Sequence, residues 1–448
     1  MTVSTKTEAE FLSSLDCTHV RVGVVDLDGV IRGKYLAKEK FLSVLEGGSA
    51  FCSVIFGWDS NDTLYNNDYT GWANGYPDDQ VRVVVESRRV LPESKTPFYL
   101  MEFTGRGTQI CPRSLAGRVL ERAKSSGFSV KAGFEYEFYG FDETPESARE
   151  KHNCDLVPMT VSTGGYSIIR SSVYEEFFEG LLELSEQLKT PIEGLHPEAG
   201  KGALEYALCP SDGIEAADRA AIFKTFSKIW GQRHGVMLCY MAKPNVNLPG
   251  CGGHLHLSLS REGEPAFFDS TRDDNLSDVA RYFIAGQQKF MPEVLAMTAP
   301  TVNSFTRLTP GYWAPTASNW GFDNRTCSLR VVGDSPKSLR VEYRVTSADA
   351  NPYLVFAAAI ASGLAGIEAA MEPEPPTSGN AYEVEHPDEM RFPSTLGAAA
   401  ARLRASHMAR DWFGDEFVDH FATSREFEET EYRAHVSDWE MSRYFEMI

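Results

Sequence analysis

Hydrophobic and polar residues alternate in two short stretches near the start of the chain. In residues 19–36, HVRVGVVDLDGVIRGKYL, an alternating stretch precedes Asp28-Gly29 and a second short stretch follows it. A period of two is typical of a strand, and Asp-Gly favours a tight turn. Residues 80–87, QVRVVVES, repeat the alternation. The first hundred residues therefore predict a small β-rich domain that begins with a hairpin.

Between these strands, residues 57–79 are rich in glycine, aspartate and asparagine. The segment is too polar for a core and long enough to predict a functional loop.

From Pro112 onward, helical patterns alternate with short strands, which places a domain boundary near residues 105–107. The strands are GFEYEFYGF, GALEYAL, GHLHLSLS, SLRVV and SLRVEYRV. This order predicts an α+β catalytic domain with helices packed outside a sheet. The predicted helices are 114–126, 173–189, 213–233, 276–297, 352–371, 394–405 and one after Ser424.

Composition narrows the class of protein. The 448 residues are 42% hydrophobic and 24% charged, as in globular proteins with a large core. A formal charge of -20 gives no general attraction to nucleic acid. The eight cysteines form no CxxC pair. The first residues lack an export signal, and no apolar run is long enough to span a membrane. We expect a cytoplasmic protein with reduced thiols and no membrane partner.

Acidic residues recur at chemically suggestive positions. Glu135 and Glu137 stand two apart in a strand pattern, so both carboxylates point to one face. The segment HPEAGKGALE adds His196, Glu198 and Glu205 beyond a glycine-bearing turn. Either group alone is also explained by acids on a solvated surface. Together they predict a site where carboxylates need cations between them.

Histidines and arginines accompany these acids. GCGGHLHLSLS places His254 and His256 on one strand face after glycines that permit close approach of a ligand. A histidine is often a core residue, but two at alternate positions favour metal or phosphate binding. LRVEYR places Glu342 between two arginines on one strand face. A solvent-exposed strand with salt bridges would also explain this pattern. Those two arginines are Arg340 and Arg344, and the preceding segment NRTCSLR supplies Arg325 and Arg330.

Five glutamates with one or two histidines suit Mg²⁺ or Mn²⁺, which prefer carboxylate oxygen. Arginines beside such ions fit a transferring phosphoryl group, whose charge they stabilise. The residues alone therefore indicate phosphoryl transfer and leave the acceptor open.

Nine collinear segments of this chain resemble glutamine synthetases over nearly its full length. They are DLDGVIRGK at 26–34, FEYEF at 134–138, HPEAGKGALE at 196–205, MAKP at 241–244, GCGGHLHLSLS at 250–260, NSFTRLTPGYWAP at 303–315, DNRTCSLR at 323–330, SPKSLRVEYR at 335–344 and NPYL at 351–354. The resemblance implies a β-grasp-like domain over residues 1–106. It also implies a catalytic domain over residues 107–448, with a curved antiparallel sheet and helices outside.

The resemblance also implies roles for individual residues. One metal is expected on Glu137, Glu198 and Glu205, and a second, beside the ATP phosphates, on Glu135, His254 and Glu342. Arg325 and Arg330 are expected to stabilise the transferring phosphoryl group. The residues expected to contact glutamate are Gly250, Arg307 and Arg344, and those expected to contact ATP are Glu193, His256, Ser258, Lys337 and Arg340.

Two positions depart from the family pattern. Ammonia-using enzymes carry a glutamate where this chain has Trp313, and an indole cannot pair with ammonium or act as a base. The family usually has glutamine where this chain has Ala203, which alters the surroundings of glutamate and amine. Asp59 is matched to the aspartate that a neighbouring subunit contributes to ammonium activation.

Three functions follow from these residues. The first is a ligase that joins L-glutamate to an organic amine, preferably an alkyl or aryl monoamine, through γ-glutamyl phosphate at the expense of ATP. Trp313 favours it because indole offers an apolar or π face. The second is an ordinary glutamine synthetase, and the third is a non-catalytic structural or regulatory relative. The resemblance also implies a homo-oligomer, a hexameric ring or stacked hexamers, with each site shared between neighbouring subunits.

Overall fold

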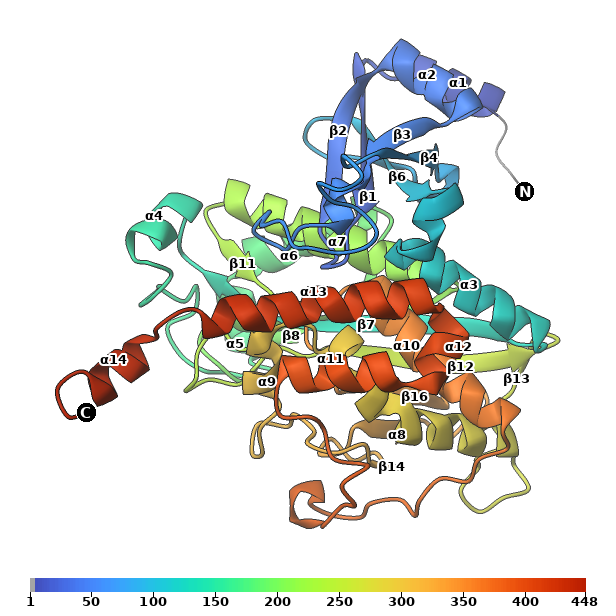
Figure 1. Cartoon of the computed structure of the whole chain (residues 1–448), viewed down its shortest axis with the longest axis vertical. Coiled ribbons are helices and arrows are strands. Elements are labelled where there is room, and N and C mark those ends of the chain that lie inside the picture. Colours follow the sequence, from blue (N-terminus) through green and yellow to red (C-terminus); the bar gives the residue numbers. More distant parts are fainter. Residues whose placement is uncertain (1–4) are drawn as a thin grey trace.

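The computed structural model describes residues 5–448 and contains two sheets, one in each half of the molecule (Figure 1). Residues 1–4, which belong to the predicted domain 1–106 and to the N-terminal segment without an export signal pattern, lie outside the described part. None of the described helices is long and apolar enough to cross a membrane.

The N-terminal sheet has the order β2-β1-β6-β4-β3, with β5 beside β6. The predicted hairpin is confirmed, because β1 and β2 pair antiparallel on either side of Asp28-Gly29. Strand β1 also pairs parallel with β6, which makes the sheet mixed. The elements are α1 (Thr5–Ser13), β1 (His19–Val25), β2 (Ile31–Ala37), α2 (Lys38–Gly47), β3 (Ser49–Cys52), η1 (Ser53–Phe56), β4 (Asp78–Val83), η2 (Val85–Ser87), β5 (Arg89–Val90), β6 (Pro97–Phe103) and η3 (Gly105–Gln109).

The second, curled sheet has the order β14-β15-β16-β12-β7-β9-β8, with short strands beside β7 and β12. Its pairs are antiparallel except for β14 with β15. Its strands are β7 (Ser129–Phe141), β8 (Ile192–Pro197), β9 (Ala203–Leu208), β10 (Ser211–Asp212), β11 (Met237–Cys239), β12 (Gly253–Arg261), β13 (Glu264–Pro265), β14 (Trp320–Phe322), β15 (Leu329–Val332) and β16 (Arg340–Tyr343). The α+β class expected from the sequence is confirmed.

The six bounded helix predictions correspond to α3, α6, α7, α8, α10 and α11. The predicted C-terminal helix after Ser424 is present as the second half of α13, which already begins at Asp415, directly after Gly414, and α14 follows it. The helices of this half are α3 (Pro112–Ser125), α4 (Pro145–Glu150), α5 (Ile168–Val173), α6 (Glu175–Gln187), α7 (Glu215–Arg233), α8 (Asp278–Thr298), α9 (Val302–Arg307), α10 (Pro352–Glu368), α11 (Leu396–Ala405), α12 (His407–Phe413), α13 (Asp415–Arg433) and α14 (Asp438–Tyr444), with the 3-10 turn η4 (Ala381–Glu383).

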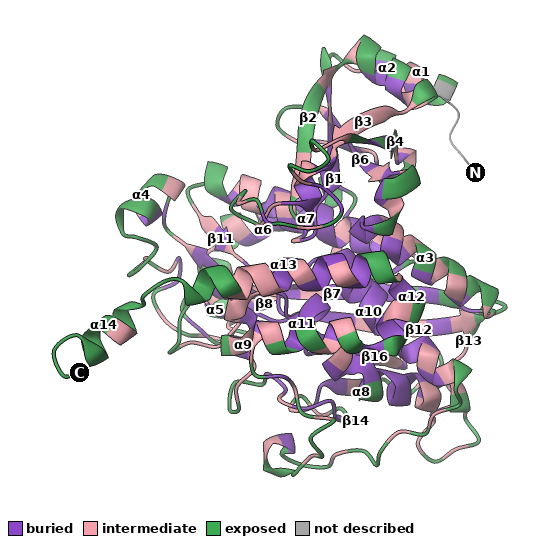
Figure 2. Ribbon diagram, in the orientation of Figure 1, coloured by how far each residue is buried: buried purple, intermediate pink, exposed green. Residues whose placement is uncertain are grey.

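Buried residues gather around β7, β12, α8 and α10 (Figure 2). Helix α10 is apolar on almost all sides, as expected for a helix surrounded by protein. At its N-terminus, the Asn351 amide donates to the backbone carbonyls of Asp26 and Leu27 at 2.9 and 3.2 Å. Arg425 of α13 forms an ion pair with Asp28 at 2.7 Å. The hairpin turn is thereby fixed to the half that contains the second sheet.

Candidate active site

Strand register gathers the predicted acids around the middle of β7. Glu135 lies opposite His254 of β12, and Glu137 lies opposite Glu205 of β9. On the far side of β12, His256 lies opposite Glu342 of β16. Because alternate residues of a strand share a face, these side chains converge on one side of the sheet.

The first cluster consists of Glu135, His254 and Glu342, which each offer one ligand atom within 4.8 Å of the others. His254 Nδ1 lies 3.0 Å from Glu135 Oε1 and 3.5 Å from Glu342 Oε1. Glu342 is fully buried and accepts hydrogen bonds from Arg330 and Arg344. The cluster is therefore rigidly held from both sides.

Charge partners govern the ionisation of this cluster. Burial alone raises the pKa of Glu135, but hydrogen bonds from His254 and His256 outweigh it and hold the pKa well below its usual value. Burial also opposes ionisation of Glu342, and the charges of Arg344 and His254 lower its pKa to about 2. Both carboxylates are therefore anionic near neutral pH.

The second cluster consists of His196, Glu198 and Glu205, again within 4.8 Å of one another. Burial, with the charges of Glu135 and Glu137, raises the pKa of Glu205 to about 8. Such a rise indicates more negative charge than the neighbouring protein groups neutralise.

These two donor sets fit hard divalent cations. Each offers carboxylate oxygens with a single imidazole and no thiolate, which suits Mg²⁺ or Mn²⁺ better than zinc. Glu137 is turned partly aside, because one of its oxygens accepts the backbone N–H of Gly252. Its position opposite Glu205 still keeps it at the rim of the second cluster.

Both clusters open into one cavity of about 810 Å³. Arg325, Arg330, Arg344 and Gly250 also line it. Among the described residues, Arg325 has no ion pair or hydrogen bond, so its charge is free to meet an anionic ligand. The cavity thus combines two candidate cation sites with a guanidinium available to a phosphoryl group.

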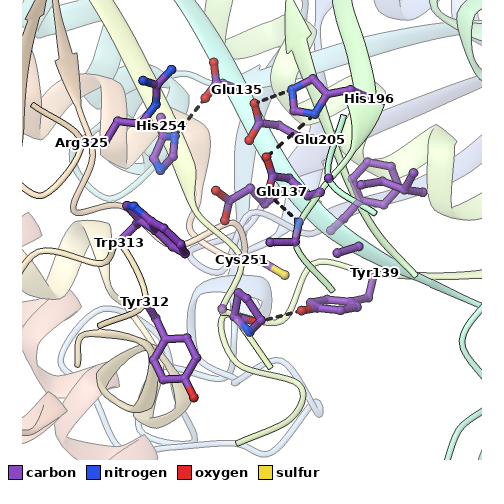
Figure 3. A pocket seen from close by; sticks show the side chains of 18 of the residues that line it. Glu135, Glu137, Tyr139, His196, Glu205, Cys251, His254, Tyr312, Trp313 and Arg325 are labelled. Atoms are coloured by element: carbon purple, nitrogen blue, oxygen red, sulfur yellow. Dashed lines mark hydrogen bonds and ion pairs between the residues drawn. The ribbon is translucent and has the colours of Figure 1, made fainter. Parts of the chain in front are cut away.

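An aromatic wall lies opposite the carboxylates (Figure 3). Trp313 is 56% exposed and its backbone has φ +54°, a conformation unusual for a bulky residue. The neighbouring Tyr312 packs against Lys243, whose Nζ lies 3.9 Å from the ring centroid. The flap of residues 309–315 brings these two rings to the cavity and contains no acidic residue.

Comparison with known proteins identifies the fold. The family model "Glutamine synthetase, catalytic domain" matches residues 109–444.

The chain belongs to the glutamine synthetase family.

Its relatives differ in the acceptor that their names specify. The chain is 40% identical over 438 residues to type-1 glutamine synthetase 2 of Dictyostelium discoideum, covering 96% of this chain and 84% of the relative. It is 33% identical over 446 residues to glutamate–isopropylamine ligase of a Pseudomonas species, covering 98% and 97%. A solved structure of GmaS without ligand superposes with a TM-score of 0.85 at 24% identity, covering 100% of both chains. The protein is therefore an enzyme of this family, a carbon–nitrogen ligase.

The family resemblance gave no role to two residues that line the cavity, Tyr166 and His196. Tyr166 lies over His196 with ring centroids 4.4 Å apart and is 66% exposed. His196 itself joins the second cluster, although the resemblance gave it no role. The signal for His196 was its position two residues before Glu198. Tyr166 stands in an irregular loop, where no periodicity marks it.

Some residues expected to bind substrates lie outside the cavity lining. Arg307 is buried and donates to the backbone carbonyls of Val345 and Arg344 at 2.9 and 3.3 Å. Arg340 donates to His256 Nδ1 at 3.1 Å, which joins two of the residues assigned to ATP. Ser258 follows His256 on β12, and the side chains of Glu193 and Lys337 are exposed.

Asp59 also lies away from the cavity of its own chain. Its Oδ1 accepts the backbone N–H groups of Asn61 and Thr63, both at 2.8 Å, within the loop of residues 57–79. A role for Asp59 in a neighbouring subunit stays a prediction.

Proposed function

We propose that this enzyme forms a γ-glutamyl amide from L-glutamate and an organic amine, with ATP as co-substrate and γ-glutamyl phosphate as intermediate. The observation that carries the proposal is the position of Trp313, whose indole lines the cavity where ammonia-using relatives are expected to place a carboxylate. Ala203, also in the lining, leaves room beside the carboxylates.

The chemistry of the acceptor explains the preference. Ammonium must be paired with an anion and then deprotonated before it attacks, which a flap carboxylate assists. An indole contributes only cation–π attraction and apolar contact. An alkyl or aryl substituent gains both contributions, at roughly 25 cal/mol per Å² of buried apolar surface, and ammonia has no substituent to bury. Tyr166 offers a second aromatic face for the same substituent.

Other residues would act on glutamate and on the phosphoryl group. In our proposal Gly250, Arg307 and Arg344 hold glutamate, while Arg325 and Arg330 face the charge that develops during phosphoryl transfer. The two carboxylate clusters would hold Mg²⁺ or Mn²⁺, which would supply positive charge to neutralise the phosphates. The ATP-binding role of Glu193, His256, Ser258, Lys337 and Arg340 is part of the same proposal.

Glutamine synthesis from ammonia is the second candidate. The 40% identity to the Dictyostelium glutamine synthetase favours it. Glu198 and the exposed residue Tyr166 line the cavity and supply polar groups to receive ammonium.

One assay separates the two candidates. Phosphate release from ATP in the presence of glutamate is measured with ammonia and with a panel of alkyl, hydroxyalkyl and aryl monoamines. The products are identified by mass spectrometry. We expect a higher kcat/KM for at least one monoamine than for ammonia. If ammonia is faster than every amine, the specialised-amine proposal is wrong and glutamine synthesis replaces it.

A further inference from the structure

The hydroxyl of Tyr139 joins two loops of the active site. Tyr139 is a buried residue near the end of β7, and its ring also borders the main cavity. The hydroxyl donates to the backbone carbonyl of Pro249 at 2.9 Å (Figure 3). Pro249 directly precedes Gly250, which our proposal assigns to glutamate binding.

The Gly250 loop is closely packed and held on both sides. A Cβ at Gly250 would lie 2.6 Å from the Ala242 carbonyl oxygen and 2.7 Å from Arg307 Cγ. After Gly250, the Cys251 N–H donates to that same Ala242 carbonyl at 2.8 Å. Before Gly250, the Tyr139 hydroxyl holds Pro249. The Tyr139 hydroxyl and the Cys251 N–H thus hold the two peptide groups of Gly250, and Lys243 Nζ holds the preceding Leu248 carbonyl at 2.6 Å.

The same hydroxyl contacts the loop that carries Glu198. A Cβ at Gly200 would lie 2.8 Å from the Tyr139 oxygen, so this loop approaches the hydroxyl through a glycine. A phenol hydroxyl carries a proton that it can donate at neutral pH.

We propose that Tyr139 is a positioning residue for glutamate: its hydroxyl fixes the Gly250 loop against the loop of the second carboxylate cluster. The inference rests on the proposed function, in which Gly250 contacts glutamate. Tyr139 itself need not touch the reacting atoms. Losing one hydrogen bond of a neutral donor should weaken the pre-organised glutamate site without removing any ligand of the metals or of ATP.

The test is Tyr139→Phe, which keeps the ring and removes only the oxygen. Tyr240→Phe is the matched control, because the Tyr240 hydroxyl is also buried but lies 2.9 Å from Ser227 Oγ, outside the cavity lining. We expect Tyr139→Phe to raise the KM for glutamate roughly 3- to 10-fold and to leave the KM for ATP unchanged. Calorimetry with L-glutamate, in the presence of ADP and Mg²⁺, should show the same loss of affinity. The control should change neither value.

The outcomes distinguish this inference from the function on which it rests. If wild type releases phosphate with glutamate and an amine or ammonia, but Tyr139→Phe has the wild-type KM for glutamate, Tyr139 has no positioning role. Equal rises in the KM for glutamate and for ATP, or the same rise in Tyr240→Phe, would mean a general structural effect and overturn the inference. No glutamate-dependent activity of wild type with any acceptor would overturn the proposed function and the inference together.

Discussion

Trp313 is the residue that most directly links this structure to a choice of acceptor. We predict that Trp313→Ala lowers kcat/KM for the preferred amine by roughly 2- to 30-fold, the equivalent of a cation–π contact of about 0.5 to 2 kcal/mol. The value for ammonia should change less, because ammonia has no substituent to contact the indole. Steady-state kinetics with both acceptors give the ratio.

Trp439→Ala provides a control for that ratio. Trp439 is 60% exposed on α14, which projects from the body of the molecule (Figures 1 and 2). Its loss should leave the ratio of amine to ammonia use unchanged. An unchanged ratio in Trp313→Ala as well would show that the indole does not select the acceptor.

Because both clusters consist mainly of carboxylates, we predict that enzyme activity depends strictly on divalent cations. Activity should disappear in excess chelator and return with Mg²⁺ or Mn²⁺, because several carboxylates share the site. Glu137→Gln should raise the Mn²⁺ concentration needed for half-maximal activity at least about tenfold, since one anionic oxygen donor is lost. Mn²⁺ binding followed by electron paramagnetic resonance measures the change without turnover. Wild-type turnover persisting in chelator would contradict the assignment.

At the scale of elements, the spacing of residues along the chain predicts which side chains share one face of a strand, because that depends only on neighbouring residues. The two-residue spacing of Glu135 and Glu137 is enough to place both on one face of β7. Which strands lie beside β7 is set by pairing between distant segments, and a shift of one residue would reverse every side chain. The register of β8 and β9, for example, places His196 opposite Glu205 and so brings it into the second cluster. Family resemblance supplied the rest of the ligand set.

The residue at which α13 begins could likewise not be predicted from the pattern of apolar residues. Phe417, Val418 and Phe421 are buried at helical spacing, but Gly414, with φ +88°, separates α12 from α13 within one continuous apolar pattern. The break depends on a backbone conformation that the pattern of apolar residues does not display.

His420 of α13 makes the joint between the two halves sensitive to pH. Its Nε2–H donates to the Phe56 carbonyl at 2.7 Å, and burial lowers its pKa to about 4. Because the unfolded chain binds this proton near pH 6.5, the contribution to stability is complete above pH 6.5 and is lost as the pH falls toward 4. Between pH 6.5 and 5, the loss is about 2 kcal/mol at 1.36 kcal/mol per pKa unit.

We predict that His420→Gln, which keeps an N–H donor but does not titrate, reduces the loss of unfolding free energy between pH 7 and pH 5 by up to about 2 kcal/mol. Urea unfolding at the two pH values measures it. His435→Gln, at an exposed histidine just beyond α13, should behave like wild type. Equal pH dependence in all three proteins would show that His420 does not control this joint.

At the scale of the whole molecule, the arrangement of Asp59 favours an assembly. The loop of residues 57–79 belongs to the N-terminal half, and Asp59 is not part of the cavity lining of its own chain. We propose a homo-oligomer, a hexameric ring or stacked hexamers, in which Asp59 reaches the active site of the next subunit. Light scattering should then give a mass of six or more chains, and a fully active monomer would contradict the assembly.

Mixing two inactive variants tests the shared site itself. Glu137→Gln damages the catalytic half of a subunit and leaves its Asp59 intact, whereas Asp59→Asn does the reverse. Each variant alone should have low activity, because every site in its ring combines one intact half with one damaged half. In randomly mixed rings, about one site in four would combine the two intact halves and regain activity, because a head-to-tail interface joins different surfaces of neighbouring subunits. Co-expression with two affinity tags isolates the mixed rings. Activity no higher than that of the separate variants would place Asp59 outside the neighbouring site, whereas wild-type activity of Asp59→Asn alone would exclude it from the reaction.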